Sequence, residues 1–163
     1  MPLLDRNGWK AEDFARDPAA DAAILPFADV EAVLAARRPG TRIGVDLPND
    51  VHPRALLPFQ DRLDLIAIAF PRFSDGRGFS LGRMLREQGY RGILRASGWI
   101  IPDQFAFALH CGFDEIELDD AQAGRQPIEQ WLRAAGLFSD SYQDTQDGLV
   151  SVFRRRRAAA AAA

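Results

Sequence analysis

The sequence predicts an α/β fold in which alternating βα units surround a mainly parallel sheet of about five strands. Three observations support this prediction. Strand-like and helix-like segments alternate about five times at a pitch of roughly 20 to 27 residues, which is typical of right-handed βαβ units. The apolar run from Leu63 to Phe70 contains one charged residue, Asp64, and does not alternate, as expected for a strand covered on both faces. Residues 127–135 carry apolar side chains at the spacing of an amphipathic helix.

Length and composition indicate a single domain. The chain has 163 residues, of which 47% are hydrophobic and 26% charged, as in a soluble globular protein with one core. We expect an N-terminal arm over residues 1–23, an α/β domain over 24–153 and a basic, alanine-rich tail over 154–163. The low complexity of the tail predicts a solvated or frayed segment, with an electrostatic contact as the alternative.

The expected elements follow from turn residues and periodicity. The arm is expected to be irregular, with at most a short strand or helical turn near residues 12–16. Pro39-Gly40, Gly89 and Gly112 end predicted helices, and Pro53 suits a first helical turn. The expected strands span residues 23–26, 41–47, 64–70, 92–96 and 113–118, with residues 149–153 as a candidate edge strand. The expected helices span residues 28–37, 52–59, 78–88, 102–111 and 127–135.

Two closures of the sheet fit this alternation. One is an open, doubly wound sheet, and the other is a curved half-barrel of βα units. The exposed edges of a half-barrel would favour pairing with a second copy of the chain or with a partner. In both closures, functional residues gather at the carboxyl ends of the parallel strands.

Charge and composition argue against several classes of protein. The formal charge of −3 is unlike that of a general nucleic-acid binder. A single cysteine cannot form an internal disulfide or hold an iron–sulfur cluster, which favours a reducing compartment. No apolar run approaches the ~20 residues of a membrane span, and acidic residues near the N-terminus argue against a secretion signal. We therefore expect a cytoplasmic protein that binds neither membrane nor nucleic acid.

The loop after the central strand is the first candidate site. Its arginines, with the backbone N–H groups that open the next helix, are suited to a small oxyanion. The predicted anion-binding residues are Arg72, Arg77, Ser80 and Arg95. The alternative is that the arginines pair with nearby carboxylates and only tie loops together.

Two aspartates and an apolar lip complete the candidate residues. Asp75 and Asp103 each precede a predicted helix, where an aspartate can act as a general acid or base or can cap the helix. Trp99, followed by two isoleucines, forms an apolar lip. With Gln104 it is predicted to be a docking surface if exposed, or part of the core if buried.

The sequence predicts no cofactor and no metal site. In the run Gly76 to Gly82 the third glycine comes one residue later than in a dinucleotide-binding loop, and no Gly-Lys-Ser or Gly-Lys-Thr ends a phosphate loop. The two histidines, His52 and His110, are far apart in the sequence, and Cys111 is expected to be a small buried hydrophobe.

Five short motifs lie along the middle of the chain: Phe70 to Ser80, Leu85-Arg86-Glu87, Gly92 to Ala96, Asp103-Gln104 and Cys111 to Asp114. Together they resemble a known bacterial family, called domain of unknown function 934. The resemblance covers residues 41–118. Arg72 stands where the family usually has lysine, and His110 where it usually has arginine.

The resemblance implies a context in sulfur metabolism. Members of the family are typically encoded beside sulfite reductase and are commonly named as oxidoreductases of sulfite reduction. The residues themselves give no redox signature. We therefore expect an accessory protein of assimilatory sulfite reduction, acting with sirohaem sulfite reductase or another sulfur-assimilation protein. The alternative is an independent α/β enzyme that acts on a small anionic substrate.

Overall fold

The computed structural model describes residues 1–136, in which a seven-stranded sheet is combined with five α-helices. The strands are β1 (Leu3–Asp5), β2 (Gly8–Lys10), β3 (Ala22–Pro26), β4 (Arg42–Leu47), β5 (Leu65–Phe70), β6 (Ile93–Gly98) and β7 (Glu115–Glu117). The α-helices are α1 (Val30–Ala35), α2 (Arg77–Glu87), α3 (Pro102–His110), α4 (Asp120–Arg125) and α5 (Ile128–Gly136). Short 3-10 helices are η1 (Phe27–Asp29), η2 (Pro53–Leu56) and η3 (Gln60–Arg62).

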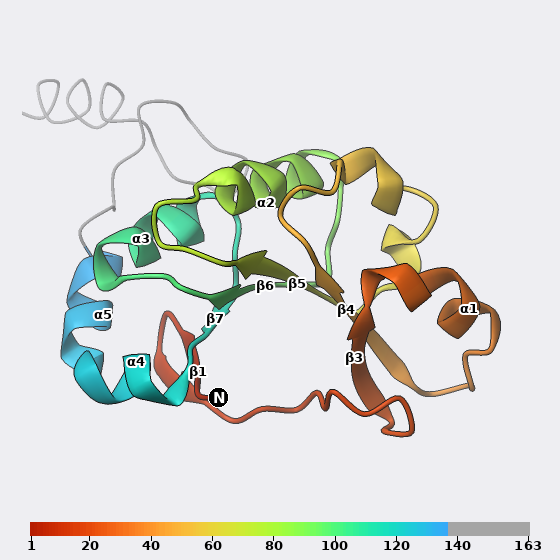
Figure 1. Cartoon of the computed structure of the whole chain (residues 1–163), viewed down its shortest axis with the longest axis horizontal. Helices are drawn as coiled ribbons and strands as arrows, with labels where there is room; N and C mark the ends of the chain where they lie inside the picture. Colours follow the sequence, from red (N-terminus) through yellow and green to blue (C-terminus); the bar gives the residue numbers. More distant parts are fainter. Residues whose placement is uncertain (137–163) are drawn as a thin grey trace, which may run out of the picture.

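The sheet is mainly parallel, as predicted. Strands β3 to β7 lie side by side in chain order and are parallel, whereas β1 pairs antiparallel with both β7 and β2. Because the order of the parallel strands never reverses, the sheet lacks the switch point of a doubly wound fold. Right-handed crossovers that all run in one direction place the connecting helices on one face. Figure 1 shows α1, α2 and α3 on that face.

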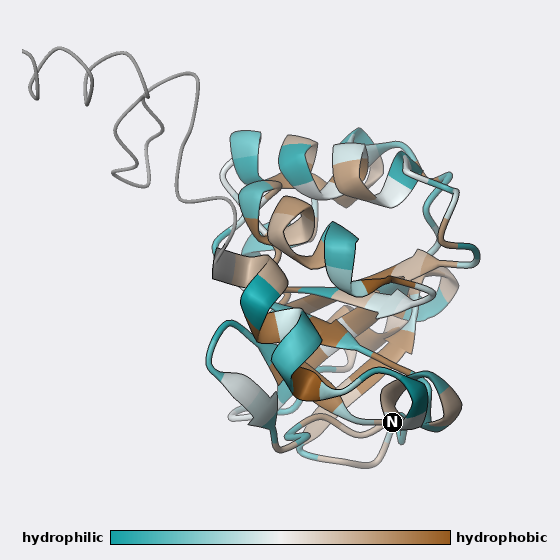
Figure 2. Ribbon diagram, turned by 90° about the vertical axis from the view of Figure 1, so that its left-hand side faces the viewer, coloured by the Kyte–Doolittle hydropathy of each residue, from teal (hydrophilic) through white to brown (hydrophobic). Residues whose placement is uncertain are grey.

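The helix-covered face holds the main hydrophobic core. Alternate residues of β4, β5 and β6 point into it and meet the apolar sides of α2 and α3. The ring of Phe70 lies 4.7 Å from that of Phe79 and 5.8 Å from that of Phe113. Gly82 lies so close to Phe113 that a Cβ atom would come within 2.4 Å of the ring. In Figure 2 the strands are mostly brown, while the helices mix hydrophobic and hydrophilic residues.

The opposite face is covered by the chain between β2 and β3. This segment, residues 11–21, runs beneath the sheet on the side away from α2 (Figure 1). Its Phe14 is buried in a small second cluster that includes Ile24, Leu65 and Ala67. A parallel bridge between Ala15 and Ala23 attaches the segment to β3. We call residues 11–21 the strap.

The structure differs from the sequence prediction at three places. The first ten residues form β1 and β2 rather than an irregular arm, because β1 pairs with the free edge of β7. Directly after the predicted strand 113–118, the Asp119 side chain accepts a hydrogen bond from the Gln122 backbone N–H and caps α4, a helix that the sequence did not predict. Strand β7 is also shorter than predicted. The predicted edge strand at 149–153 and the tail lie outside the described residues.

Other predicted elements are confirmed. Strands β3 to β6 and helices α1, α2, α3 and α5 lie within a few residues of the predicted ranges, and the helix predicted at 52–59 is the 3-10 helix η2. Within residues 1–136, none of the helices combines the length and the apolar character needed to cross a bilayer.

Candidate functional site

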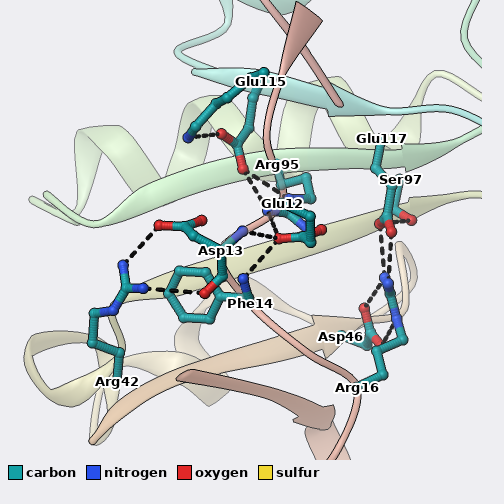
Figure 3. Close-up of polar contacts among 11 residues, drawn as sticks. Glu12, Asp13, Phe14, Arg16, Arg42, Asp46, Arg95, Ser97, Glu115 and Glu117 are labelled. Carbon is teal, nitrogen blue, oxygen red and sulfur yellow. Dashed lines mark hydrogen bonds and ion pairs between the residues drawn. The ribbon is translucent and has the colours of Figure 1, made fainter. Parts of the chain in front are cut away.

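Charged side chains are concentrated on the strap-covered face of β6 and β7. In both strands an apolar residue of the core separates two polar residues: Ala96 lies between Arg95 and Ser97, and Ile116 lies between two glutamates. The register places Arg95 beside Glu115 and Ser97 beside Glu117. Because side chains alternate along a strand, all four polar side chains point toward the strap (Figure 3).

Arg95 is the centre of the first ion-pair cluster. Its side chain is 0% exposed, and its guanidinium donates to Glu115 at 2.8 Å and to both carboxylate oxygens of Glu12 at 2.7 and 3.0 Å. Lys10 binds the other oxygen of Glu115 at 2.5 Å. Burial by itself lowers the pKa of Arg95, but the hydrogen bonds to Glu12 and the charge of Glu115 outweigh it and raise the pKa. Two cations therefore balance two carboxylates in this cluster.

Arg16, from the strap, is the centre of the second cluster. Its guanidinium donates to the two carboxylate oxygens of Glu117 at 2.6 and 2.7 Å, and to those of Asp46 at 3.1 and 3.2 Å. The Ser97 hydroxyl donates to Glu117 at 2.9 Å. Burial by itself raises the pKa of Glu117, but the hydrogen bonds from Arg16 and Ser97 outweigh it, so the pKa falls below its ordinary value and the group is ionised at neutral pH.

A cavity of about 410 Å³ borders the second cluster. It opens beyond the carboxyl ends of β4, β5 and β6, where function collects in parallel sheets. Ala67 and Ala69 project toward the strap face, and their small side chains leave this space unfilled. The lining residues are Met1, Arg16, Asp46, Leu47, Pro48, Ala67, Ala69 and Ser97. This combination of an open volume, apolar walls and ionised groups makes it the strongest candidate for a small-molecule site in the described part of the chain.

The predicted anion-binding residues do not converge. Arg95 points to the strap face, whereas Arg72, Arg77 and Ser80 are exposed in the loop and helix on the other face. Arg77 is already paired with Asp75, at 2.7 Å. The hydrogen bond from Arg77 lowers the pKa of the Asp75 carboxyl below its ordinary value. This pairing is the loop-bracing arrangement that the sequence offered as the alternative.

The remaining predicted residues lie at the start of α3. Asp103 is exposed and borders a second hollow of about 490 Å³ between α3 and α5. Trp99 is 45% exposed. Gln104 joins two loops, because its side-chain amide donates to the Phe73 carbonyl at 2.7 Å and its side-chain oxygen accepts from the Ile101 backbone. The catalytic, anion-binding and docking roles of all these residues stay predictions.

A comparison with family models identifies the family of the chain. Residues 44–153 match the model described as "Bacterial protein of unknown function (DUF934)". The chain belongs to the DUF934 family. A search of curated proteins found no match to it.

The match covers the strands, helices and ion-pair partners of this DUF934 protein from β4 onward. Asp46, Arg95, Ser97 and Glu117 all fall within the matched residues. The strap, with Glu12 and Arg16, precedes the matched residues in the sequence. The site therefore combines side chains of the family region with side chains of the N-terminal segment.

Sequence reasoning missed the strap residues and the pairing of charges across the sheet. One signal for the sheet residues was present: Glu115 and Glu117 are two residues apart within the predicted strand 113–118, which places them on one face. Ser97 lay just beyond the predicted strand 92–96, and the structure extends that strand to Gly98. No comparable signal identified Glu12, which lies 83 residues from its partner Arg95.

The single cysteine of the DUF934 protein is buried, as predicted. Burial raises the pKa of the Cys111 thiol to about 11, so the thiol is protonated at neutral pH. Among residues 1–136, no three His, Cys, Asp or Glu side chains are grouped in a way that could hold a metal ion.

Proposed function

We propose that this DUF934 protein is an accessory protein of assimilatory sulfite reduction, which docks on sirohaem sulfite reductase. The contact is made by an exposed surface at the end of the sheet where β5 and β6 finish. Its members are Phe73, Trp99, Gln104 and Phe107, which we call the aromatic surface.

The observation that carries this proposal is the exposure of three large aromatic side chains around Gln104. Phe73, Trp99 and Phe107 are 57%, 45% and 46% exposed. Aromatic side chains are enriched at the centres of protein interfaces, where they supply most of the binding free energy. Their exposure on the β5–α2 loop, the β6–α3 loop and α3 therefore favours a role in contacting another protein.

The aromatic surface is also held in place. Gln104 fixes the loop that carries Phe73 against the start of α3, and the Phe107 ring packs edge-on against the buried Phe79 ring at 5.1 Å. The Trp99 backbone donates to the Phe70 carbonyl at 2.8 Å. A pre-positioned surface loses less conformational entropy when a partner binds.

The choice of sulfite reductase as the partner rests on what the family resemblance implies, namely that members are typically encoded beside that enzyme. The chain's own chemistry favours a binding role over an independent reaction on an anion. Arg77 is neutralised by Asp75, and Arg95 by Glu12 and Glu115. Two of the three arginines predicted to hold the anion are therefore already paired.

The direct test is binding to the purified sirohaem sulfite reductase of the same cell, measured by calorimetry. We expect the wild type to bind, and the double variant Phe73→Ser/Phe107→Ser to bind at least ~10-fold more weakly, because truncating exposed aromatic anchors typically costs more than 1 kcal/mol each. The matched control is Leu57→Ser, beside η2, since Leu57 is 45% exposed and lies outside the aromatic surface. Absence of wild-type binding, or equal weakening by the control, would refute the proposal.

A growth experiment tests the pathway separately from the contact. Deletion of the gene should impair growth on sulfate and on sulfite, and sulfide should restore it, because only the reduction of sulfite is affected. Complementation with the Phe73→Ser/Phe107→Ser variant should fail, whereas Leu57→Ser should complement. Normal growth of the deletion strain on sulfate and sulfite would count against the proposed pathway.

A further inference from the structure

The cavity between the strap and the ends of β4 to β6 lies on the face opposite to α2, so it is separate from the aromatic surface. We propose that this cavity binds a small organic cation, in which a primary ammonium group is attached to a short apolar body. The ammonium group binds Asp46 and Ser97, and the apolar body lies against the alanines of β5.

The balance of charge around the cavity favours a cation. The second cluster combines one guanidinium, Arg16, with two carboxylates, Asp46 and Glu117, which leaves one negative charge in excess. The charges of the first cluster balance one another, so that cluster does not compensate for the excess negative charge. Met1 also lines the cavity, and its amino group is paired with Asp120 at 3.7 Å. A bound monocation would neutralise the excess charge.

The hydrogen bonds of Arg16 disfavour an anion at the same place. Four of its N–H groups already donate to carboxylate oxygens, two to Glu117 and two to Asp46. An anionic ligand would find one remaining N–H group beside two carboxylates that are already bound. Three negative groups would then surround one positive group, which is electrostatically unfavourable.

Two groups at the cavity can accept hydrogen bonds from an ammonium ion. The bonds from Arg16 to Asp46 are longer than those to Glu117, and the Asp46 side chain is 40% exposed, so its oxygens keep lone pairs for a further donor. The Ser97 hydroxyl uses its hydrogen to donate to Glu117, which leaves its oxygen free to accept. An ammonium group carries three donors and no acceptor, and it matches these acceptors.

The rest of the lining suits a short hydrocarbon body. Leu47 and Pro48 continue the wall beyond Asp46, and Ala67 and Ala69 form an apolar surface without long side chains. Small-molecule sites typically combine such apolar walls with a few polar groups that orient the ligand. The cavity volume of about 410 Å³ is ample for a chain of about four carbon atoms.

The test compares three probes with the same four-carbon chain, n-butylammonium, 1-butanol and the anion pentanoate, in titrations of the full-length protein followed by backbone NMR. Because each probe has few atoms, we expect dissociation constants on the order of millimolar. Butylammonium should shift the amide signals of Ala67, Ala69 and Ser97 saturably, with an affinity about threefold or more above that of butanol. Pentanoate should bind more weakly than both.

Variants distinguish the contribution of the Asp46 charge to binding from that of the cavity volume. Asp46→Asn should lower the affinity for butylammonium to that for butanol, and Ala69→Leu should weaken both probes by filling the cavity. The matched control is Asp13→Asn, because Asp13 is similarly exposed and is paired with Arg42 outside the cavity. It should leave both affinities unchanged. Unperturbed amide signals in α2 and α3 show that each variant is folded.

Three outcomes would overturn the proposal. One is binding of pentanoate as tight as that of butylammonium. Another is an unchanged butylammonium affinity in Asp46→Asn. The third is the lack of a saturable shift with any probe up to about 50 mM, well above the expected dissociation constants. Binding of sulfite reductase would be unaffected by each of these results, so this proposal and the proposed function can fail independently.

Discussion

The two faces of the sheet are built from the same strands but are stabilised by different interactions. On the helix-covered face, alternate residues of β4, β5 and β6 are aliphatic or aromatic and join one large core with α2 and α3. On the strap-covered face, the apolar cluster around Phe14 is small, and β6 and β7 contribute charged groups instead. One face therefore depends on packing, and the other on complementary charges.

This difference has consequences for how each face tolerates change. Apolar contacts are non-directional, so losing one costs the buried area and the resulting cavity. A buried ion pair contributes little net stability, but removing one member leaves the other charge buried without a partner. The strap face should therefore be the more sensitive to a single substitution and the less sensitive to a paired, charge-balanced one.

The largest effect is expected for Arg95→Ala. This change leaves Glu12 and Glu115 without their shared guanidinium, and we expect the free energy of unfolding to fall by about 3–5 kcal/mol. Urea denaturation followed by circular dichroism measures it. The matched control is Arg83→Ala, which breaks an exposed pair with Glu87 on α2 and should cost about 0.5 kcal/mol or less. Equal losses of unfolding free energy in the two variants would mean that the buried Arg95 cluster is no more important for stability than an exposed ion pair.

A smaller loss is expected from overpacking the helix-covered face. In Gly82→Ala the new Cβ atom would meet the Phe113 ring at 2.4 Å, and we expect a destabilisation of about 1–3 kcal/mol. The same substitution at Gly124, in α4, meets no atom within 4 Å. Because alanine favours a helix over glycine by up to about 1 kcal/mol, Gly124→Ala should be neutral or stabilising. Thermal unfolding of both variants checks the contrast, and a stable Gly82→Ala would contradict the packing described here.

The smallest effect is a pH dependence on the strap face. Because the folded-state pKa of Glu117 lies below its ordinary value of 4.5, its stabilising contribution is complete above about pH 4.5 and is lost as pH falls through the folded-state pKa. The difference in unfolding free energy between the wild type and Glu117→Gln should therefore be constant from about pH 7 to pH 5 and should shrink below about pH 4.5. A difference that grows on acidification would contradict this assignment.

Local sequence signals were sufficient for most elements of the sheet and helices. The β5 run, the periodicity of α5 and the glycines after α2 and α3 each act within a few residues, so the sequence shows them directly. The first two strands were missed because three residues each carry little periodicity. Strand β1 is stabilised by pairing with β7, more than 100 residues away, and β2 by pairing with β1. Helix α4 was missed because its cap, Asp119, directly follows the predicted strand 113–118 and its capping role was not recognised.

The candidate site shows the same division between local and distant information. The sequence identified Arg95 as an anion-binding candidate near the carboxyl end of a strand and Trp99 as part of an apolar lip, but it placed Arg95 with Arg77. The structure separates them because neighbouring residues of a strand point to opposite faces: Leu94 and Ala96 join the helix-covered core, so Arg95 faces the strap.

By itself, then, the sequence determined an α/β chain with a mainly parallel sheet and membership of the DUF934 family, because those properties follow from local periodicity and motifs. Only the tertiary structure decided which charges meet. The partners of Arg16 are 30 and 101 residues away in the chain, and such ion pairs depend on strand order, register and the path of the strap. None of these three is encoded by a pattern within a single segment.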